Sequence, residues 1–223
     1  MAPIIHTVNL RKVYAVGKER VIALNDVSIS IENGEFCCIV GQSGSGKSTL
    51  LNQLAGLEKP TRGKVFIGSH EISAMTEDEL AKFRQAHLGF IFQSYNLLPT
   101  MTAAENVAMP LMFKGISRSQ RLAMARALLH DSPIYVFDEA TSNVDAESEN
   151  DIMKAIHSLA GKKTVILISH RLAHGGHSDC IYAMSNGRVM EQGTHAELLA
   201  QQGAYSRLYL AQRQLETLEE EDA

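Results

Sequence analysis

Short apolar runs divided by turn-prone segments set the pattern of this chain. Near its start, the turn sequences ENGE and KPTRG separate apolar stretches, which predicts a β-rich opening. Three later runs each end in a polar residue, as is typical of buried parallel strands that present functional groups at their C-terminal ends. The predicted strands cover residues 4–10, 21–31, 35–40, 64–68, 87–93, 133–139 and 164–170.

Helical patterns alternate with the later strands, so the sequence predicts an α/β fold with a mostly parallel sheet. Ser117 and Gln120 have the S-x-x-Q spacing of a capping box, and apolar residues recur on one face after them, so a helix is expected to begin near Ser117. A helix N-terminus attracts anions, which raises the question of whether this one meets a phosphate. The other predicted helices cover residues 47–56, 194–201 and 204–218, and the acidic residues 219–223 are expected to form a frayed, solvated end.

The most specific motif is GQSGSGKST, which begins at Gly41 between an apolar strand and a predicted helix. Gly46, Lys47 and Ser48 complete the pattern G-x-x-x-x-G-K-[ST] of a phosphate-binding loop. Glycines let successive backbone N–H groups surround phosphate oxygens, Lys47 supplies a positive charge for the β- and γ-phosphates, and the Ser48 hydroxyl can ligate magnesium. The residues predicted to hold the nucleotide here are Gly41, Gln42, Ser43, Gly44, Ser45, Gly46, Lys47, Ser48 and Thr49.

Asp138 and Glu139 follow four apolar residues at the end of a predicted strand. Two adjacent carboxylates in that position are costly unless a cation or a hydrogen-bond network is nearby. The pattern favours Asp138 as a magnesium partner and Glu139 as the base that orients and deprotonates an attacking water. The alternative is that both acids only favour the dipole of a following helix.

Composition limits the classes of protein that this sequence can encode. The 223 residues suffice for one sizeable domain, the apolar content is 45%, and the net charge of −4 provides no basic field for nucleic acid. Cys37, Cys38 and Cys180 form neither a disulfide framework nor a metal knuckle, so buried reduced thiols are expected. With no secretion signal and no membrane-spanning run in the pattern, a cytoplasmic protein is expected.

Taken with these motifs, further segments resemble the ATP-binding cassette (ABC) ATPases, the motor subunits of membrane transporters. The segment IFQSYNLLP resembles their glutamine loop, with Gln93, and the segment after the Asp138 strand resembles their aspartate loop, with Asp145. The segment ILISHRL resembles their switch-histidine segment, with His170, and Tyr14 matches the aromatic residue that stacks on adenine. The resemblance covers nearly the whole chain and keeps the family's order of motifs.

The resemblance implies a P-loop NTPase core with a mostly parallel sheet, an N-terminal antiparallel β subdomain and a truncated helical subdomain. It implies that ATP and Mg²⁺ bind, with Ser48, Gln93 and Asp138 near the metal. Hydrolysis would involve Glu139, His170 and Gln93. The implied partners are membrane permease subunits and a second ATPase domain, in a homo- or heterodimer held on the inner face of the cell membrane, with no nucleic acid.

The two halves of the chain resemble different branches of the family. The first half is similar to the stand-alone ATPases of lipoprotein-releasing and macrolide-exporting systems, and the second to the C-terminal ATPase domain of exporters with fused membrane spans. At the junction, residues 114–118 stand where the family has a Leu-Ser-Gly-Gly-Gln signature, and the interval from Gln93 to Gln120 is too short for the helices that precede it. We therefore expect one ABC-type domain over residues 1–223, with a shortened helical region at about 94–118 and a helix N-terminus that has lost its phosphate role.

Two classes of function follow from these observations. The first is an ATP-hydrolysing subunit that energises a separate permease, for export or for release of lipids or lipoproteins. The second is a nucleotide-binding chain with impaired hydrolysis, inert or regulatory. Soluble ABC proteins of translation or DNA repair fit less well because the chain has one cassette and no long insertion, and small-molecule kinases do not account for Gln93, Asp145 and His170 together.

The histidines near the last predicted strand allow another interpretation. His174 and His177, together with His170 and Cys180, could be drawn as a zinc site. Two adjacent glycines between these histidines make that geometry loose, so ordinary surface histidines are favoured.

Overall fold

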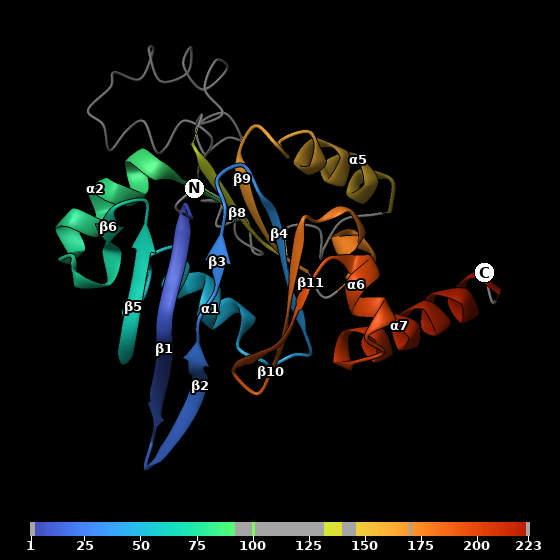
Figure 1. Cartoon of the computed structure of the whole chain (residues 1–223), viewed down its shortest axis with the longest axis horizontal. Helices are drawn as coiled ribbons and strands as arrows, with labels where there is room; N and C mark the ends of the chain where they lie inside the picture. Colours follow the sequence, from blue (N-terminus) through green and yellow to red (C-terminus); the bar gives the residue numbers. More distant parts are fainter. Residues whose placement is uncertain (1–2, 92–99, 101–131, 140–145, 170, 222–223) are drawn as a thin grey trace.

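Two β-sheets with helices around them make up the architecture of the computed structural model (Figure 1). The structure describes residues 3–91, 100, 132–139, 146–169 and 171–221. The helix expected near Ser117 and the shortened region at about 94–118 lie outside these residues, apart from Thr100.

The first sheet is antiparallel and has the strand order β2-β1-β5-β6, with β3 paired to β1. The single strand predicted over residues 21–31 is two strands, because Asp26 adopts a left-handed φ of 65° and the Ile29 N–H donates to the Thr7 hydroxyl. The prediction of an antiparallel β region at the start of the chain is confirmed. The strands are β1 (Ile5–Val16), β2 (Glu19–Val27), β3 (Ser30–Ile31), β5 (Arg62–Ile67) and β6 (His70–Glu71).

The second sheet has the order β11-β10-β4-β9-β8-β7 and is parallel except for the pair of β10 and β11. Its central strands are buried throughout, which explains why they read as continuous apolar runs in the sequence. This sheet confirms the predicted α/β class. The strands are β4 (Phe36–Gly41), β7 (Leu88–Ile91), β8 (Ile134–Asp138), β9 (Thr164–Ile168), β10 (Cys180–Ser185) and β11 (Arg188–Gly193).

Helix α1 (Lys47–Leu54) lies between the two sheets, where Leu50, Leu51 and Leu54 join a core cluster that contains residues of both (Figure 1). A second core cluster covers the other face of the parallel sheet, against α5, α6 and α7. The remaining helical elements are η1 (Ile72–Ala74), α2 (Glu77–His87), α5 (Ala146–His157), η2 (Leu172–His177), α6 (His195–Ala200) and α7 (Ala204–Glu221).

Two smaller expectations have different outcomes. Cys37, Cys38 and Cys180 are free and buried, as predicted, and burial raises the pKa of each thiol. The acidic end was expected to fray from residue 219, but α7 continues to Glu221, because consecutive glutamates are good helix formers. Among the helices that the structure describes, none is long and apolar enough to span a bilayer.

Candidate functional site

The carboxyl ends of three neighbouring parallel strands form the base of the site. Ile168 at the end of β9 pairs with Ile39 of β4 on one side and with Asp138 of β8 on the other. The backbone N–H of Glu139 donates to the carbonyl of Ile168 at 3.1 Å. This register brings the loop after β4 and the acidic pair after β8 to the same edge of the sheet.

The loop after β4 makes a close turn that only glycine fits at two positions. A Cβ at Gly41 would lie 2.4 Å from the Met184 carbonyl oxygen, and a Cβ at Gly46 would lie 2.5 Å from the Ala23 carbonyl oxygen. Gly46 also adopts a φ of 102°, which L side chains rarely adopt. The motif glycines are therefore required by backbone packing as well as by phosphate approach.

We expect Gly46→Ala to destabilise the protein more than Gly44→Ala. Gly44 has a φ of 75° and nothing within 4 Å of a Cβ, so alanine there bears only the left-handed conformational cost, about 1–2 kcal/mol. At position 46 the contacts with Ala23 and Leu24 add overpacking of roughly 1–3 kcal/mol. Urea unfolding of the two variants measures the difference, and equal losses would show that the backbone at position 46 relaxes freely.

Lys47 is held inside the loop by backbone carbonyl groups. The residue is only 6% exposed, and its Nζ donates to the carbonyl oxygens of Gly41 at 2.9 Å and of Gln42 at 3.1 Å. Burial lowers the pKa of Lys47, and the carboxylates of Glu139 and Asp138 oppose that shift. The ammonium is thus fixed at the mouth of the loop, within the electrostatic reach of both acids.

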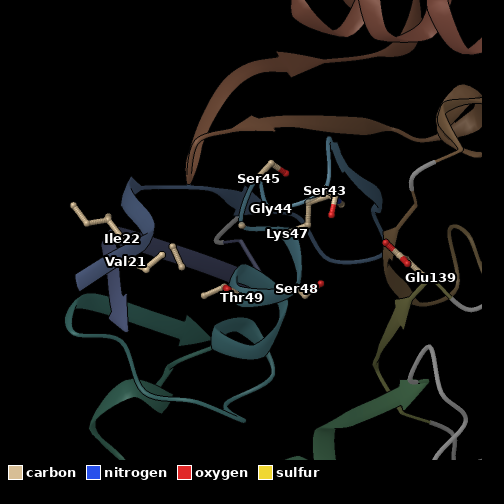
Figure 2. A pocket seen from close by; sticks show the side chains of 11 residues that line it. Val21, Ile22, Ser43, Gly44, Ser45, Lys47, Ser48, Thr49 and Glu139 are labelled. Atoms are coloured by element: carbon tan, nitrogen blue, oxygen red, sulfur yellow. The ribbon is translucent and has the colours of Figure 1, made fainter. Parts of the chain in front are cut away.

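A pocket of about 620 Å³ opens over this loop. Figure 2 shows the loop side chains between Val21 and Ile22 of β2 on one side and Glu139 on the opposite side. The wall is therefore apolar at the β2 end and acidic at the β8 end. The lining residues are Val21, Ile22, Ala23, Ser43, Gly44, Ser45, Gly46, Lys47, Ser48, Thr49 and Glu139.

Asp138 carries an unsatisfied acceptor at the site. Its Oδ1 atom is buried and has no hydrogen-bond partner among the described residues. Burial raises the pKa of Asp138, the negative charge of Glu139 raises it further, and Lys47 opposes the shift. A carboxylate destabilised in this way is suited to a cation, and the exposed Ser48 hydroxyl at the pocket supplies a second oxygen of the type that magnesium prefers.

Tyr14 lies next to the pocket but does not line it. It pairs with Val21 across β1 and β2, and its hydroxyl donates to Oε2 of Glu58 at 2.6 Å. Burial raises the pKa of this phenol, and so does the hydrogen bond to Glu58. The Nζ atom of Lys12 lies 5.1 Å from the ring centroid, so one face of the ring carries a cation–π contact.

Gln93, Asp145 and His170 all lie outside the described residues, so their predicted roles stay predictions. The chain on either side of them is described in part. Ile91 at the end of β7 pairs with Phe137 of β8, and Ile168 ends β9. The strands that lead to Gln93 and His170 therefore end at the same edge of the sheet as Asp138.

A polar cluster around the buried carboxylate of Glu149, beside this edge, was missed by the motif analysis. Glu149 of α5 pairs with Arg171 and His174, and His174 contacts Ser169. The expectation that His174 is an ordinary surface residue is wrong, because its side chain is only 14% exposed and faces the Glu149 carboxylate. The sequence feature that points to this cluster is the acidic segment DAESEN, but its composition does not predict which side chains these acids contact.

The zinc interpretation gains no support from the part of the chain that the structure describes. No group of three or more His, Cys, Asp or Glu side chains there is placed to hold a metal ion. His177 makes an edge contact with the His157 ring, and His174 has its acidic partner Glu149.

The strand, loop and helix around Lys47, with the acidic strand end opposite, define a phosphate-loop nucleotide-binding domain. The profile of the family described as "ABC transporter" matches residues 24–121. An uncharacterised ABC transporter ATP-binding protein of Thermotoga maritima is 35% identical, over 85% of this chain and 94% of the relative. The chain belongs to the ABC transporter family, as an ABC-type ATPase domain.

Solved structures agree with this assignment. The dimeric ATP-binding cassette MJ0796 of Methanocaldococcus jannaschii, in a post-hydrolysis state bound to ADP and Pi, superposes with a TM-score of 0.78 at 32% identity. That match covers 85% of this chain and 98% of the other. A bacterial Atm1-family ABC exporter with ATP bound gives a TM-score of 0.70 at 28% identity, over 95% of this chain and 42% of that one.

One relative carries residues that have no counterpart here. The macrolide export ATP-binding/permease protein MacB of Hyphomonas neptunium is 33% identical over a matched stretch of 237 residues, which is longer than this chain of 223. The match includes 92% of this chain and 37% of MacB. Because the matched stretch is longer than this chain, MacB must contain residues within the match that this chain lacks.

Proposed function

We propose that this chain is the ATP-binding and ATP-hydrolysing subunit that energises a separate membrane permease. The observation that carries the proposal is the pocket over the glycine loop, with Lys47 fixed at its mouth and Glu139 at the opposite wall. Phosphate groups fit a loop with a buried ammonium, and an acid across from it is placed to act on a water.

The residues proposed for the site divide into three sets by chemistry. Ser48 and Asp138, with Gln93, would hold Mg²⁺. When bound, the ion would neutralise the negative charge that develops on the phosphate during transfer. Glu139 is the base that orients and deprotonates the attacking water, and His170 donates a hydrogen bond to the γ-phosphate. Tyr14 would stack on adenine beside Val21, and Asp145 would meet the nucleotide from its own loop.

The partners follow from the relatives. MacB is named as an ATP-binding/permease protein, and this chain corresponds to 37% of it. The MJ0796 cassette is dimeric in its solved structures. We therefore propose that the chain pairs with a second ATPase domain and works on the inner face of the cell membrane through permease subunits, as one domain over residues 1–223.

Glu139→Gln is expected to preserve ATP binding and abolish turnover. The amide keeps the shape of the side chain and loses only the proton acceptor, so phosphate release should fall by roughly 100-fold or more. Isothermal titration with Mg-ATP and steady-state phosphate release measure the two properties. Glu77→Gln, an exposed acid in the first turn of α2, is the matched control. Persistent turnover in the Glu139 variant would remove the base assignment.

A further inference from the structure

Glu149 is the centre of an ionic cluster between α5 and the segment that follows β9. It is 5% exposed, and Oε2 pairs with the guanidinium of Arg171. Nε2 of His174 lies 3.3 Å from Oε1, a contact without aligned hydrogen-bond geometry that is an ion pair only when the imidazole is protonated. A carboxylate this deeply buried is costly without partners, and here its two basic neighbours come from one short segment.

Ser169 ties the same segment together from within. Its Oγ accepts from the Arg171 N–H at 3.0 Å, lies 3.0 Å from the Arg171 carbonyl oxygen, and lies 3.1 Å from Nδ1 of His174. The hydroxyl donates its single proton to the carbonyl, which can only accept, so Oγ meets Nδ1 of His174 with a lone pair and Nδ1 carries the hydrogen. Both neighbours of residue 170 are thus fixed, Ser169 through its hydroxyl and Arg171 through Glu149.

The cluster is continuous with the nucleotide site. Ile168, directly before Ser169, accepts the backbone N–H of Glu139 at 3.1 Å. On the other side, the Leu172 N–H donates to Oε1 of Gln212 in α7 at 2.9 Å. The segment that carries residue 170 is therefore held at its start by the strand end with Glu139, and after it by α5 and α7.

We propose that Glu149 is a positioning residue, which fixes Arg171, and through it Ser169, beside α5 and so sets the place of His170 at the γ-phosphate. The proposal rests on the proposed function of His170. If this contact between α5 and the segment after β9 served only stability, apolar side chains of similar size would stabilise the fold equally well. Here, polar contacts from outside reach both residues that flank position 170, Glu149 on Arg171 and His174 on Ser169.

The test is the preference of the protein for ATP over ADP. A non-hydrolysable ATP analogue and ADP, each with Mg²⁺, are titrated against the natural sequence, Glu149→Gln, His170→Ala and the double variant. A hydrogen bond to a charged phosphate typically gives about 10-fold in affinity, so His170→Ala should lower the ATP preference by about that factor. Glu149→Gln should lower it several-fold, leave ADP affinity within about twofold, and add nothing in the double variant.

Glu191→Gln is the matched control. Its carboxylate accepts the backbone N–H of Tyr205 at 2.9 Å and that of Ala204, and so holds the start of α7. None of these contacts involves Ser169 or Arg171. This variant should keep the full ATP preference. Thermal unfolding of all four variants shows that each is folded.

The possible outcomes separate the two proposals. A reduced ATP preference in His170→Ala with an unchanged one in Glu149→Gln overturns the positioning role alone. Equal weakening of ATP and ADP in Glu149→Gln shows a purely structural residue and also overturns it. An unchanged preference in His170→Ala removes the γ-phosphate contact of the proposed function, and the positioning role falls with it.

Discussion

Lys47→Ala is expected to remove most of the ATP affinity, with a rise in the dissociation constant of roughly 10- to 100-fold. Among the described residues that line the pocket, Lys47 is the one lysine, and the carbonyl oxygens of Gly41 and Gln42 hold its ammonium at the loop. Alanine removes the charge and the lysine donor to both carbonyls, although the Gln42 carbonyl keeps the Ser45 N–H at 3.1 Å. Isothermal titration with Mg-ATP measures the loss.

Lys64→Ala is the control for this experiment. Lys64 lies on β5 and pairs with Glu71 at 3.0 Å, outside the residues that line the pocket. Lys64→Ala should leave ATP affinity unchanged. It shows whether the loss of any one positive charge from the protein weakens ATP binding. Unchanged affinity in Lys47→Ala itself would contradict the phosphate-loop assignment.

The glycine loop was predictable from the sequence because its chemistry is local. The spacing of Gly41, Gly46 and Lys47 fixes a turn between a strand and a helix, and the structure shows that turn with backbone atoms within 2.6 Å of any added Cβ at both glycines. The acidic end of β8 was predictable for the same reason, since four apolar residues before two acids read as a buried strand with a functional end.

The cluster around Glu149 could not be predicted in this way. Glu149 and Arg171 are 22 positions apart, and their contact depends on how α5 packs beside the end of β9. His174 was assigned to the surface because the adjacent glycines suggested a loose loop. In the structure, those residues form the 3-10 helix η2, which directs His174 inward to Glu149. Local pattern determines elements, whereas tertiary packing determines which polar side chains share a buried site.

The break within residues 21–31 has a similar origin. The alternation of the sequence fits one long strand, but the left-handed backbone of Asp26 and the hydrogen bonds of Thr7 divide it into β2 and β3. Asp adopts that conformation more readily than most residues, but hydropathy alone does not show where it does so.

Restoring a full helical subdomain with Leu-Ser-Gly-Gly-Gln before Gln120 is expected to raise ATP hydrolysis about 100-fold or more. In the family that the chain resembles, the signature closes on the γ-phosphate held by the opposite subunit of a head-to-tail dimer. The glycines let a helix N-terminus approach the phosphate, and loss of one such donor to the transition state costs on the order of 100-fold in rate. The insertions found in MacB agree with a shortened chain.

The experiment compares steady-state phosphate release by the natural sequence and the restored version at equal concentration. Binding of Mg-ATP to the two proteins should be similar, because Lys47, Ser48 and the loop amides belong to one chain. A restored version with Glu139→Gln is the control that attributes the recovered rate to this site. Slow but measurable release by the natural sequence agrees with the proposed ATP-hydrolysing subunit, whereas no detectable release with intact binding would favour the inert or regulatory class of function.

Equal rates in the two versions would require another source of the missing contacts. Ser117, Ser119 and Arg118 are the groups that the sequence offers, in the first turn of the helix expected near Ser117. In that case hydrolysis should rise with protein concentration as dimers form, and Ser117→Ala or Arg118→Ala should remove it while leaving ATP binding intact. A rate that depends on neither residue would mean that a different part of the partner ATPase domain contacts the γ-phosphate. The sequence at residues 114–118 would then not limit turnover.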